Sequence, residues 1–527
     1  MSPAEARPPA EAQSPASLAE AVAGVLAGPA GPAIGAFFDF DGTVIDGYSA
    51  RDFYRHRLRN FSIGPLEAAQ TLLLGLRGVT SEEDFERFVA LGFAAWAGRS
   101  EDELAELGER LFTQQIAGRL FPEAWQLIRA HERMGHTLVL ASSASRFQVE
   151  PAARAAGIEH ALCTPVEVTS DGILTGRAAG PTLWRQGKAD AVRSFAAAHS
   201  VDLGSSYAYS NGDEDVPFLS AAGHPRAVNP GGHLLAHARE QGWPVLHFAG
   251  RGRPGAAQVA RTAAAYGGMF TAMATGVAFG LLNRSQRVGL DTTTTLIGEL
   301  GLGLAGVQLR VRGEQHLWDQ RPAVFLFNHQ SQLDMAILCK LIREGVTAVA
   351  KKELASHPVF GLAFRIAGVA FVDRADPGRG REALEPAVQR LRDGISVVIA
   401  PEGTRSVTPA LGEFKKGAFH MAMQAGVPIV PIVIRNAGEL MWRDAMTIRP
   451  GRVDIVVHQP IDVSSWTTEE LTKRVAEVRQ LYLDTLHSWP ASWPGPGPTP
   501  TLEPEPEPPG PVPGPAPGPE PGSEVPA

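Results

Sequence analysis

Two short apolar runs, each ending in a motif of reactive residues, constrain the fold of this chain more than any other feature. Residues 33–38 lead into the motif Asp-Phe-Asp-Gly-Thr at 39–43, and residues 323–327 lead into Asn-His-Gln-Ser-Gln-Leu-Asp at 328–334. A short apolar run that ends in a polar turn predicts a buried strand. Open α/β sheets place their ligands beyond the carboxyl ends of such strands. Because about 290 residues separate the motifs, the sequence predicts two α/β sheets, each with its own site.

The length and composition of the chain limit its class. At 527 residues it is too long for a single hydrophobic core, so we expect two to three domains. The net charge of −8 argues against the basic domain that nucleic-acid binding requires, and we expect no nucleic-acid partner. The two cysteines, Cys163 and Cys339, lie far apart in the sequence, which indicates a reduced, cytoplasmic compartment and no zinc site.

Both ends of the chain have compositions typical of disorder. The first 32 residues are rich in proline and alanine, and residues 493–527 consist mostly of proline, glycine and glutamate. Such segments bury too little apolar surface to offset the entropy of the chain. The N-terminus also lacks the basic region and apolar stretch of a secretory signal. We therefore expect residues 1–33 and 489–527 to be disordered.

Residues 34–248 contain further elements of a phosphate-binding site. A second predicted strand, residues 137–141, ends at Ser142 and Ser143, whose hydroxyl and amide groups suit phosphate oxygens. Lys188 can neutralise phosphate charge and pair with an aspartate. A third predicted strand ends in the acidic stretch that closes residues 207–215, which offers the oxygen ligands that Mg²⁺ prefers. Each feature alone is weak, since a lone lysine is usually solvated, but the series in this order is specific.

With these motifs the segment resembles the haloacid dehalogenase superfamily, most closely its phosphoserine-phosphatase-like branch, over about residues 34–230. The resemblance implies a Rossmann-like domain with a helical cap at about residues 47–121. It implies that Asp39 attacks phosphorus to form an aspartyl-phosphate, while Asp41 protonates the leaving alcohol and then activates water. Mg²⁺ is the implied cofactor. The implied metal ligands are Asp39, Asp41, Asn211 and Asp215, and the implied substrate-binding residues are Ser142, Ser143 and Lys188.

One position departs from the family pattern. Where the family usually has the first aspartate of an Asp-x-x-x-Asp pair, this chain has Asn211, with Asp215 as the second acid. An amide oxygen can ligate Mg²⁺ but brings no negative charge, so we expect weaker metal binding, for which Asp213 is a candidate compensation. Two interpretations stay open: a working phosphatase, or a fold retained as a scaffold or sensor.

Residues 249–312 join the two segments and contain an uncharged stretch at residues 262–283. Its length suits a membrane span, but its glycines, threonines and alanines make it only marginally hydrophobic. Arginines flank the region on both sides, so no charge asymmetry supports a single crossing. We therefore expect membrane-associating helices that lie in the interface or form a shallow hairpin, on the cytoplasmic face of the cell membrane. A buried helix of a soluble domain is the alternative.

Residues 313–488 carry the second series of motifs. His329 and Asp334 are five residues apart, a spacing that a strand-to-helix corner can fold into a pair, with the carboxylate fixing the imidazole as a general base. The pair alone is a weak signal. Behind it come an arginine after another apolar run, the sequence Pro-Glu-Gly-Thr-Arg-Ser at 401–406, a pair of lysines and a proline-flanked strand at 427–431. The order of all these elements makes the signal strong.

This series resembles the glycerophospholipid acyltransferases, and within them the 1-acyl-sn-glycerol-3-phosphate acyltransferases, over about residues 310–470. The resemblance implies an α/β domain in which His329 deprotonates a glycerol hydroxyl, which attacks the thioester of acyl-CoA or acyl-carrier protein directly. Lysophosphatidic acid is the implied acceptor, and Asp334 orients His329. The residues implied to shape the site for the acceptor's phosphate are Arg374, Glu402, Gly403, Thr404 and Arg405.

Together the two resemblances predict a bifunctional enzyme that works on lipids at a membrane surface. A membrane-associating segment beside the second site fits this prediction, because lysophosphatidic acid and its acylated product are both amphiphiles. Two alternatives stay open. The first module can be regulatory and not catalytic, for which Asn211 is the clue, or the acceptor can be glycerol-3-phosphate.

Overall fold

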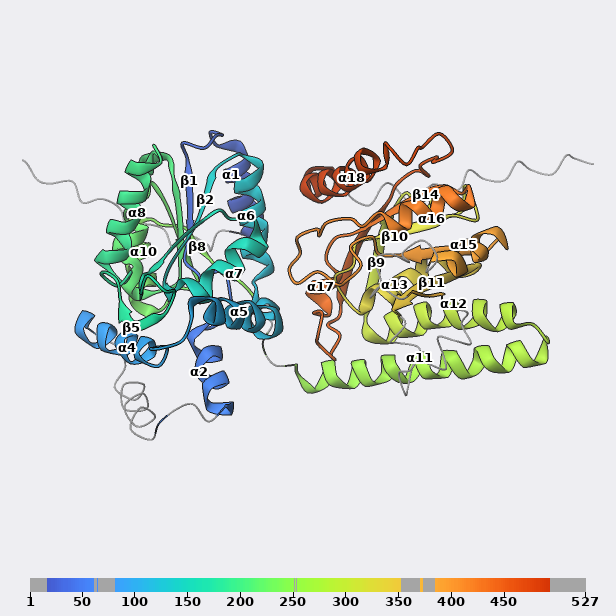
Figure 1. Ribbon diagram of the computed structural model, residues 1–527, viewed down its shortest axis with the longest axis horizontal. Coiled ribbons are helices and arrows are strands. Elements are labelled where there is room, and N and C mark those ends of the chain that lie inside the picture. Colours follow the sequence, from blue (N-terminus) through green and yellow to red (C-terminus); the bar gives the residue numbers. More distant parts are fainter. Residues whose placement is uncertain are drawn as a thin grey trace, which may run out of the picture. The chain divides into compact units, whose positions relative to one another are not determined.

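A computed structural model describes residues 17–60, 64, 81–250, 252, 254–351, 370–372 and 384–492. Within these residues a parallel sheet with its helices comes first, followed by a pair of long helices and then by a mixed sheet with its own helices (Figure 1). The predicted α/β class, with one sheet for each group of motifs, is confirmed.

All neighbouring strands of the first sheet run parallel. The strands are short and apolar, as is typical of parallel strands that helices cover on both faces. Their order across the sheet is β3 (His160–Thr164), β2 (Thr137–Ser145), β1 (Gly35–Phe38), β6 (Tyr207–Ser210), β7 (His224–Val228) and β8 (Val245–Leu246). The helices that accompany them are α6 (Pro122–Arg133), α7 (Arg146–Ala156), α8 (Gln186–Ala198), α9 (Val216–Leu219) and α10 (Gly232–Gln241).

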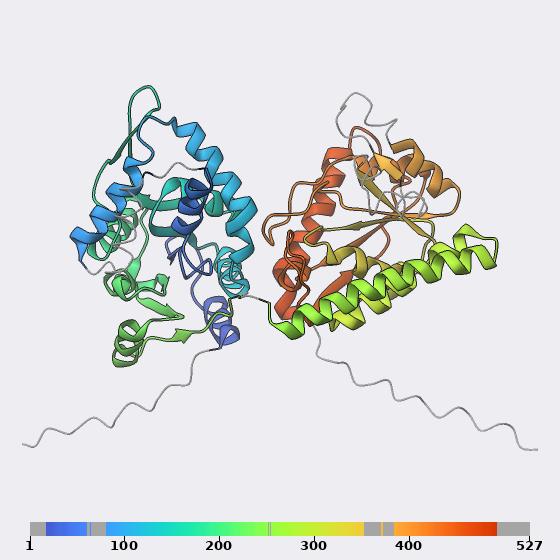
Figure 2. The ribbon, with the colours of Figure 1, turned by 90° about the horizontal axis from the view of Figure 1, so that it is seen from below.

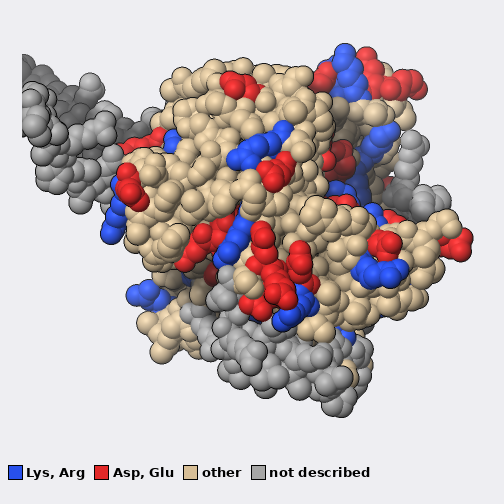
Figure 3. Space-filling view, turned by 90° about the vertical axis from the view of Figure 1, so that its left-hand side faces the viewer, with Lys and Arg blue, Asp and Glu red and all other residues tan. Residues whose placement is uncertain are grey.

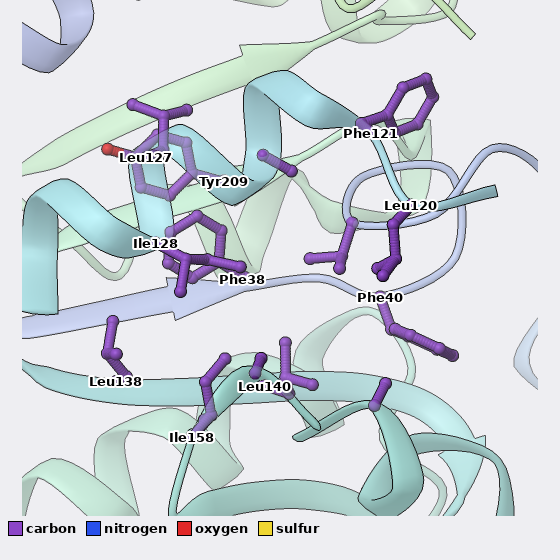
Figure 4. Packing of buried hydrophobic residues seen from close by; sticks show 14 of the residues in the cluster. Phe38, Phe40, Leu120, Phe121, Leu127, Ile128, Leu138, Leu140, Ile158 and Tyr209 are labelled. Carbon is purple, nitrogen blue, oxygen red and sulfur yellow. The ribbon is translucent and has the colours of Figure 1, made fainter. Parts of the chain in front are cut away.

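Side chains of β1 point alternately to the two faces of this sheet, and each face is buried in its own apolar layer. Phe38 packs with Leu140 in one layer, and its ring stacks on that of Tyr209 with the centroids 4.5 Å apart (Figure 4). Phe37 packs in the other layer, edge-on to Phe195. Burial on both faces fixes β1, and with it the residues that follow its carboxyl end.

A chain of buried polar groups is enclosed in the layer that contains Phe38. His136 Nε2 lies 2.9 Å from the carbonyl oxygen of Pro29, which only accepts, so Nε2 carries the hydrogen. His136 Nδ1 therefore accepts from His131 Nδ1 at 2.8 Å, and His131 Nε2 accepts from the Tyr209 hydroxyl at 2.8 Å. Burial lowers the pKa of His131 well below its usual value, and the positive charges of a protonated His136 and of Arg226 would lower it further. His131 is therefore held neutral.

The segment between β1 and α6 is largely helical. It contains α2 (Ala50–Arg59), α4 (Glu82–Ala94) and α5 (Glu101–Leu111), which leads into a π-helical turn. An apolar cluster around Trp96 joins these helices to a hairpin of β4 (Val166–Val168) and β5 (Leu174–Ala178). The helical cap was expected at about residues 47–121, of which residues 61–63 and 65–80 lie outside the described residues.

Residues 18–27, for which we expected disorder, form helix α1 (Leu18–Ala27). Ser17 and Glu20 build a capping box, in which the Ser17 hydroxyl accepts from the Glu20 N–H at 3.2 Å and the Glu20 carboxylate accepts from the Ser17 N–H at 2.8 Å. Val25 is buried, and α1 packs against α6. The expectation was wrong because prolines on both sides of this stretch obscure a capped, alanine-rich helix.

Charged side chains are interspersed on the face of the first sheet and its helices that Figure 3 shows. Acidic side chains gather near the middle of this face, with basic ones beside them and uncharged residues over most of the surface. The pattern on this face differs from the basic stripe that tracks a nucleic-acid backbone.

Two long helices, α11 (Ala256–Leu282) and α12 (Gln286–Ala305), follow the first sheet and pack against each other (Figures 1 and 2). Glycines allow their backbones to approach closely: a Cβ on Gly276 would lie 2.6 Å from the carbonyl oxygen of Gly289. Helix α11 is long and apolar enough to cross a membrane by length and composition, with a mean hydropathy of 1.3 over its most apolar window. Only 17% of that window is buried, and Leu281 and Leu282 at the end of the helix are 75% and 81% exposed.

The second sheet is parallel except where β15 (Gly451–Val457) pairs with β14 (Ile429–Ile434). Helix α12 lies against α13 (Leu333–Ile342), a helix of this sheet, where a Cβ on Gly298 would lie only 2.4 Å from the backbone N of Lys340. The strand order is β12 (Ala370–Val372), β11 (Val346–Lys351), β13 (Ser396–Ile399), β10 (Val324–Phe327), β14 (Ile429–Ile434), β15 (Gly451–Val457) and β9 (Val307–Arg312). The helices are α13 (Leu333–Ile342), α15 (Glu385–Arg392), α16 (Gly417–Ala425), α17 (Ala437–Leu440) and α18 (Leu471–Ser492). Of the expected C-terminal tail, residues 489–492 belong to α18, and residues 493–527 lie outside the described residues.

Candidate active sites

The first site begins where β1 ends. Asp39 follows Phe38, and its N–H donates to the Tyr209 carbonyl of the neighbouring strand β6 at 2.9 Å. Because β1 and β6 are parallel and in register, Asp39 comes to lie beside the residues that follow β6. The motif at 39–43 and the acidic stretch that ends at Asp215 thus meet at one edge of the sheet, as the sequence predicts.

Lys188 links the two parts of this site. It is buried in α8, and its Nζ donates to Asp39 Oδ1 and to Asp215 Oδ2, both at 2.7 Å. The Ser210 hydroxyl also donates to Asp215 Oδ2, at 2.5 Å. Burial by itself lowers the pKa of Lys188, but the charges of Asp215 and Asp39 outweigh burial and raise it above its usual value. Lys188 is therefore a fixed positive charge between two carboxylates.

The positive charge near Asp39 is not enough to keep its pKa at the usual value of an aspartate. Burial raises its pKa to about 7; Lys188 opposes this rise, while the nearby carboxylates of Asp215 and Asp41 add to it. Asp39 Oδ1 is held by Lys188, whereas Oδ2 accepts a longer bond of 3.4 Å from the Thr43 hydroxyl. Oδ2 is thus the less engaged oxygen. A cation in this crowded group of carboxylates would keep Asp39 ionised.

Asp41 is held by residues that the sequence motifs do not include. Its Oδ1 accepts from the Ser49 N–H at 2.6 Å and its Oδ2 accepts from the Ser49 hydroxyl at 3.0 Å. Gln148 Nε2 donates to that hydroxyl oxygen at 3.1 Å. Burial raises the pKa of Asp41 to about 6, although the bonds from Ser49 oppose the rise. An acid with this pKa can release and take up a proton near neutral pH.

Asn211 lies against the glycine of the first motif. Gly42 has φ +80°, and a Cβ there would lie 2.3 Å from Asn211 Nδ2, so only glycine fits. The single hydrogen of the Thr43 hydroxyl has two acceptors within reach, Asn211 Oδ1 at 3.1 Å and Asp39 Oδ2 at 3.4 Å. The Asp41 carboxylate is hydrogen-bonded to Ser49, and the Asp215 carboxylate is hydrogen-bonded to Lys188 and Ser210. In the part of the chain that the structure describes, no three His, Cys, Asp or Glu side chains are grouped to hold a metal ion.

The donor atoms nevertheless suit Mg²⁺ in their chemistry. They are oxygens throughout, and burial, with a smaller contribution from the carboxylates of Asp215 and Asp41, raises the pKa of Asp39 although Lys188 opposes the rise. Mg²⁺ keeps several waters and usually takes only one or two carboxylates from a protein. The residues present therefore fit a magnesium ion with few protein ligands.

Ser142 and Ser143 lie within β2, which continues to Ser145 beyond the predicted end of the strand. Because Phe38 pairs with Leu140, the two serines lie at the same sheet edge as Asp39. Ser142 is buried, and its hydroxyl oxygen accepts from the Ala144 N–H at 3.2 Å.

The second site forms at the corner between β10 and α13. His329 Nδ1 lies 2.8 Å from Asp334 Oδ2. Asp334 is fully buried, and the same oxygen accepts from the backbone N–H groups of Gln330 and Ser331, each at 2.8 Å. Since Asp334 Oδ2 is an acceptor for all three, Nδ1 of His329 carries the hydrogen and Nε2 is free of it in the neutral ring. The structure thus brings together the pair that the sequence predicts.

The Glu402 side chain also contacts His329, but at its backbone N–H and not at its imidazole ring. Its Oε1 accepts from the His329 N–H at 2.8 Å, and its Oε2 accepts from the Gly412 N–H at 2.8 Å. Burial raises the pKa of Glu402 although both backbone bonds oppose the rise. Each carboxylate oxygen therefore holds a backbone segment of the site.

The other residues expected around the acceptor's phosphate lie in the loop after β13. Gly403 has φ +77°, and a Cβ there would lie 3.1 Å from Lys415 Nζ, so that lysine passes close to the loop. Thr404 is exposed. Arg405 Nη1 donates to the carbonyl oxygen of Arg443, a residue that no sequence motif marked. Arg374 lies outside the described residues.

Two family models divide the chain between the two sheets. Residues 36–220 match the model described as haloacid dehalogenase-like hydrolase, and residues 308–435 match the model described as Acyltransferase. The molecule is thus an α/β protein that combines a hydrolase-like and an acyltransferase domain, as both resemblances in the sequence predict.

Curated relatives support this assignment. The chain is 31% identical over 199 residues to a 1-acyl-sn-glycerol-3-phosphate acyltransferase of Limnanthes alba, covering 37% of this chain and 69% of that protein. The protein of the same name from Cocos nucifera is 31% identical over 191 residues, which are 36% of this chain and 61% of the relative. The "Inhibition of morphological differentiation protein" of Streptomyces azureus is 34% identical over 225 residues, 41% of this chain and 79% of its own length. The chain therefore belongs to the acyltransferase family and carries a haloacid dehalogenase-like hydrolase domain.

Sequence reasoning missed Ser49, Gln148 and Arg443. Ser49 lies ten residues after Asp39, Gln148 comes from α7, and Arg443 follows α17. None belongs to a recognisable spacing, and a signal for Ser49 exists only in its place before helix α2.

Proposed function

We propose that this protein transfers an acyl chain from acyl-CoA or acyl-carrier protein to 1-acyl-glycerol-3-phosphate, giving phosphatidic acid. The observation that carries the proposal is the 2.8 Å contact between His329 Nδ1 and the buried Asp334. A buried carboxylate that accepts from Nδ1 fixes the tautomer with a free Nε2 and stabilises the imidazolium that forms during reaction.

The chemistry follows from this arrangement. His329 Nε2 takes the proton of the acceptor's free hydroxyl as its oxygen attacks the thioester carbonyl. The tetrahedral intermediate collapses with cleavage of the carbon–sulfur bond, and the thiolate takes the proton from the imidazolium. Asp334 keeps its hydrogen bond to Nδ1 and holds the ring in place. Direct attack needs no nucleophile from the protein.

The first domain is proposed to hydrolyse phosphate monoesters. Asp39 Oδ2, the less engaged oxygen, attacks phosphorus while the bond to the alcohol oxygen breaks and Asp41 gives that oxygen a proton. Asp41 then takes a proton from water, which attacks the aspartyl-phosphate and frees phosphate and Asp39. Lys188 offsets negative charge throughout. The buried carboxyl of Asp41, with a pKa of about 6, suits both proton transfers.

A magnesium ion, when bound, would supply positive charge to the phosphoryl oxygens. Asp39 and Asn211 are the side chains best placed to hold it, with Asp41 and Asp215 contributing where their present hydrogen bonds allow. Ser142 and Ser143 are proposed to contact the phosphate.

Helix α11 is proposed to rest on the cytoplasmic face of the cell membrane and bring lipid acceptors to His329. The exposed leucines at its end and its apolar window, of which only 17% is buried, support this proposal. An interfacial position explains the modest hydropathy of the helix better than a crossing does.

Three proteins test both activities: wild type, Asp39→Asn and His329→Ala. Thiol release from acyl-CoA in the presence of lysophosphatidate should be lost only in His329→Ala. Mg²⁺-dependent phosphate release from phosphoserine, lysophosphatidate or phosphatidate should be lost only in Asp39→Asn. If the wild type releases no phosphate from any of them, the first domain is a regulatory module. If it acylates glycerol-3-phosphate in preference to lysophosphatidate, the proposed acceptor is wrong.

A further inference from the structure

Two arginines lie together near the His329 corner, and only Arg405 belongs to a sequence motif. Arg405 Nη1 donates to the carbonyl oxygen of Arg443, and Arg443 Nη1 donates to the carbonyl oxygen of Arg405 at 3.3 Å. Each guanidinium thus holds the main chain of the other residue. This reciprocal arrangement brings two positive groups into one place.

The arginine pair carries more positive charge than its surroundings balance. The acid beside it is Asp444, whose oxygens lie 3.7 Å from Arg405 Nη2 and 3.7 Å from Arg443 Nε. These distances are too long for hydrogen bonds. Among the described residues, Arg443 Nε is buried and has no hydrogen-bond partner. One half-exposed carboxylate does not neutralise two guanidiniums, so the pair suits a further anion with oxygens that accept from a guanidinium fork.

The backbone segments that carry the two arginines are hydrogen-bonded to the corner that carries His329 and Asp334. Ser406, next to Arg405, donates to the His329 carbonyl from its N–H at 2.8 Å and from its hydroxyl at 3.1 Å. The Ser331 hydroxyl donates to the carbonyl of Met441, two residues before Arg443, at 2.6 Å. The segments that carry the arginine pair are therefore anchored at the corner that carries the imidazole.

We infer that Arg443 is a second phosphate-binding residue, which grips the phosphate monoester of the acceptor lipid together with Arg405. The inference rests on the proposed acyl transfer. In 1-acyl-glycerol-3-phosphate the free hydroxyl is on the carbon next to the one that bears the phosphate ester, so the phosphate lies near His329 whenever the hydroxyl does. In acyl-CoA the long pantetheine arm keeps the phosphates far from the thioester. The position of the arginine pair therefore assigns it to the acceptor.

Full-length wild type, Arg443→Gln, Arg443→Lys and the exposed control Arg452→Gln test this role. Arg443→Gln keeps a donor for the Arg405 carbonyl but loses the charge. Its KM for lysophosphatidate should rise about 10- to 100-fold, the loss expected for a charge-assisted contact, with kcat and the KM for acyl-CoA unchanged. The KM of Arg443→Lys for lysophosphatidate should lie between the values for wild type and Arg443→Gln. The KM of Arg452→Gln should equal that of wild type.

Equilibrium binding to His329→Ala protein gives a second measurement that needs no catalysis. The double variant His329→Ala with Arg443→Gln should bind lysophosphatidate more weakly than His329→Ala alone. Both proteins should bind monoacylglycerol, which lacks the phosphate, equally well. An unchanged KM for lysophosphatidate, a rise confined to acyl-CoA, or equal losses for both lipids would overturn the inference. If wild type transfers no acyl group, the proposed function fails, and the binding comparison still decides the role of Arg443.

Discussion

Replacing Glu402 by glutamine separates a positioning role from a role in phosphate binding. The Glu402 carboxylate accepts from the N–H groups of His329 and Gly412, both at 2.8 Å. Glutamine has the same shape but one acceptor oxygen, so one of these N–H groups must face an amide N–H₂ group. The loss of one hydrogen bond to a charged group costs about 1.5 to 3 kcal/mol. Burial disfavours the charged carboxylate and thereby raises the pKa of Glu402. Glutamine is uncharged and does not bear this burial cost, which offsets part of the loss.

If the lost bond loosens the main chain of His329, the cost appears in the reaction barrier. A loss of about 1.5 to 3 kcal/mol corresponds to a fall of about 10- to 150-fold in kcat. The KM for lysophosphatidate should stay constant, because the carboxylate points at backbone N–H groups. Glu402→Ala leaves both N–H groups unpaired and should be slower still and less stable to heat.

Thiol release from acyl-CoA at varied lysophosphatidate measures both constants. Glu413→Gln is the matched control, since Glu413 is in the same loop and its side chain is 89% exposed. A carboxylate near the acceptor's phosphate would repel it, so its removal would lower KM. A lower KM in Glu402→Gln, or a kcat equal to that of wild type, would refute the positioning role.

Three further predictions concern other parts of the chain. Asn211→Asp adds a carboxylate at the expected metal site, and Mg²⁺ binding measured by calorimetry should tighten by about tenfold or more; unchanged affinity would remove Asn211 from the ligands. His131 has a pKa well below that of an unfolded chain, so the unfolded state alone gains a proton as pH falls below about 6.5. Unfolding free energy should therefore fall by about 1 kcal/mol between pH 6.5 and 5.5, and His131→Gln should remove that part of the slope in denaturant titrations. Leu281→Glu with Leu282→Glu should release the protein from vesicles in flotation, since each leucine contributes about 1.5 to 3 kcal/mol when buried; retention on vesicles would contradict the interfacial role of α11.

The sequence predicted those parts of the fold in which local pattern and tertiary context agree. The runs before Asp39 and His329 are apolar and end in polar turns, and they are the central strands β1 and β10 with both faces buried. The pairing of His329 with Asp334 followed from their spacing, because a strand-to-helix corner brings positions five apart together. The pairing of Lys188 with Asp39 followed from the order of the motifs.

Other features could not be predicted, because they arise from contacts between distant segments that no sequence motif indicates. Ser49 and Gln148 hold Asp41 from elements that are about 100 residues apart, and a serine or glutamine is usually a surface residue. Helix α1 was not predicted because the proline-rich composition around it indicated disorder, although Ser17 and Glu20 form a capping box. The carboxylate of Glu402, which the motif associates with a phosphate, faces two backbone N–H groups, and only the fold reveals that direction.

The glycine contacts of helix α12 have a mechanical consequence. Gly276 brings α11 against α12, and Gly298 brings α12 against the backbone of α13, whose first turn carries Asp334. At these glycines the helices touch without a long, flexible side chain between them. A lipid surface that supports α11 would therefore hold the His329–Asp334 pair at one height above the bilayer. The enzyme would then select acceptors by the depth at which their hydroxyl lies, in addition to their chemistry.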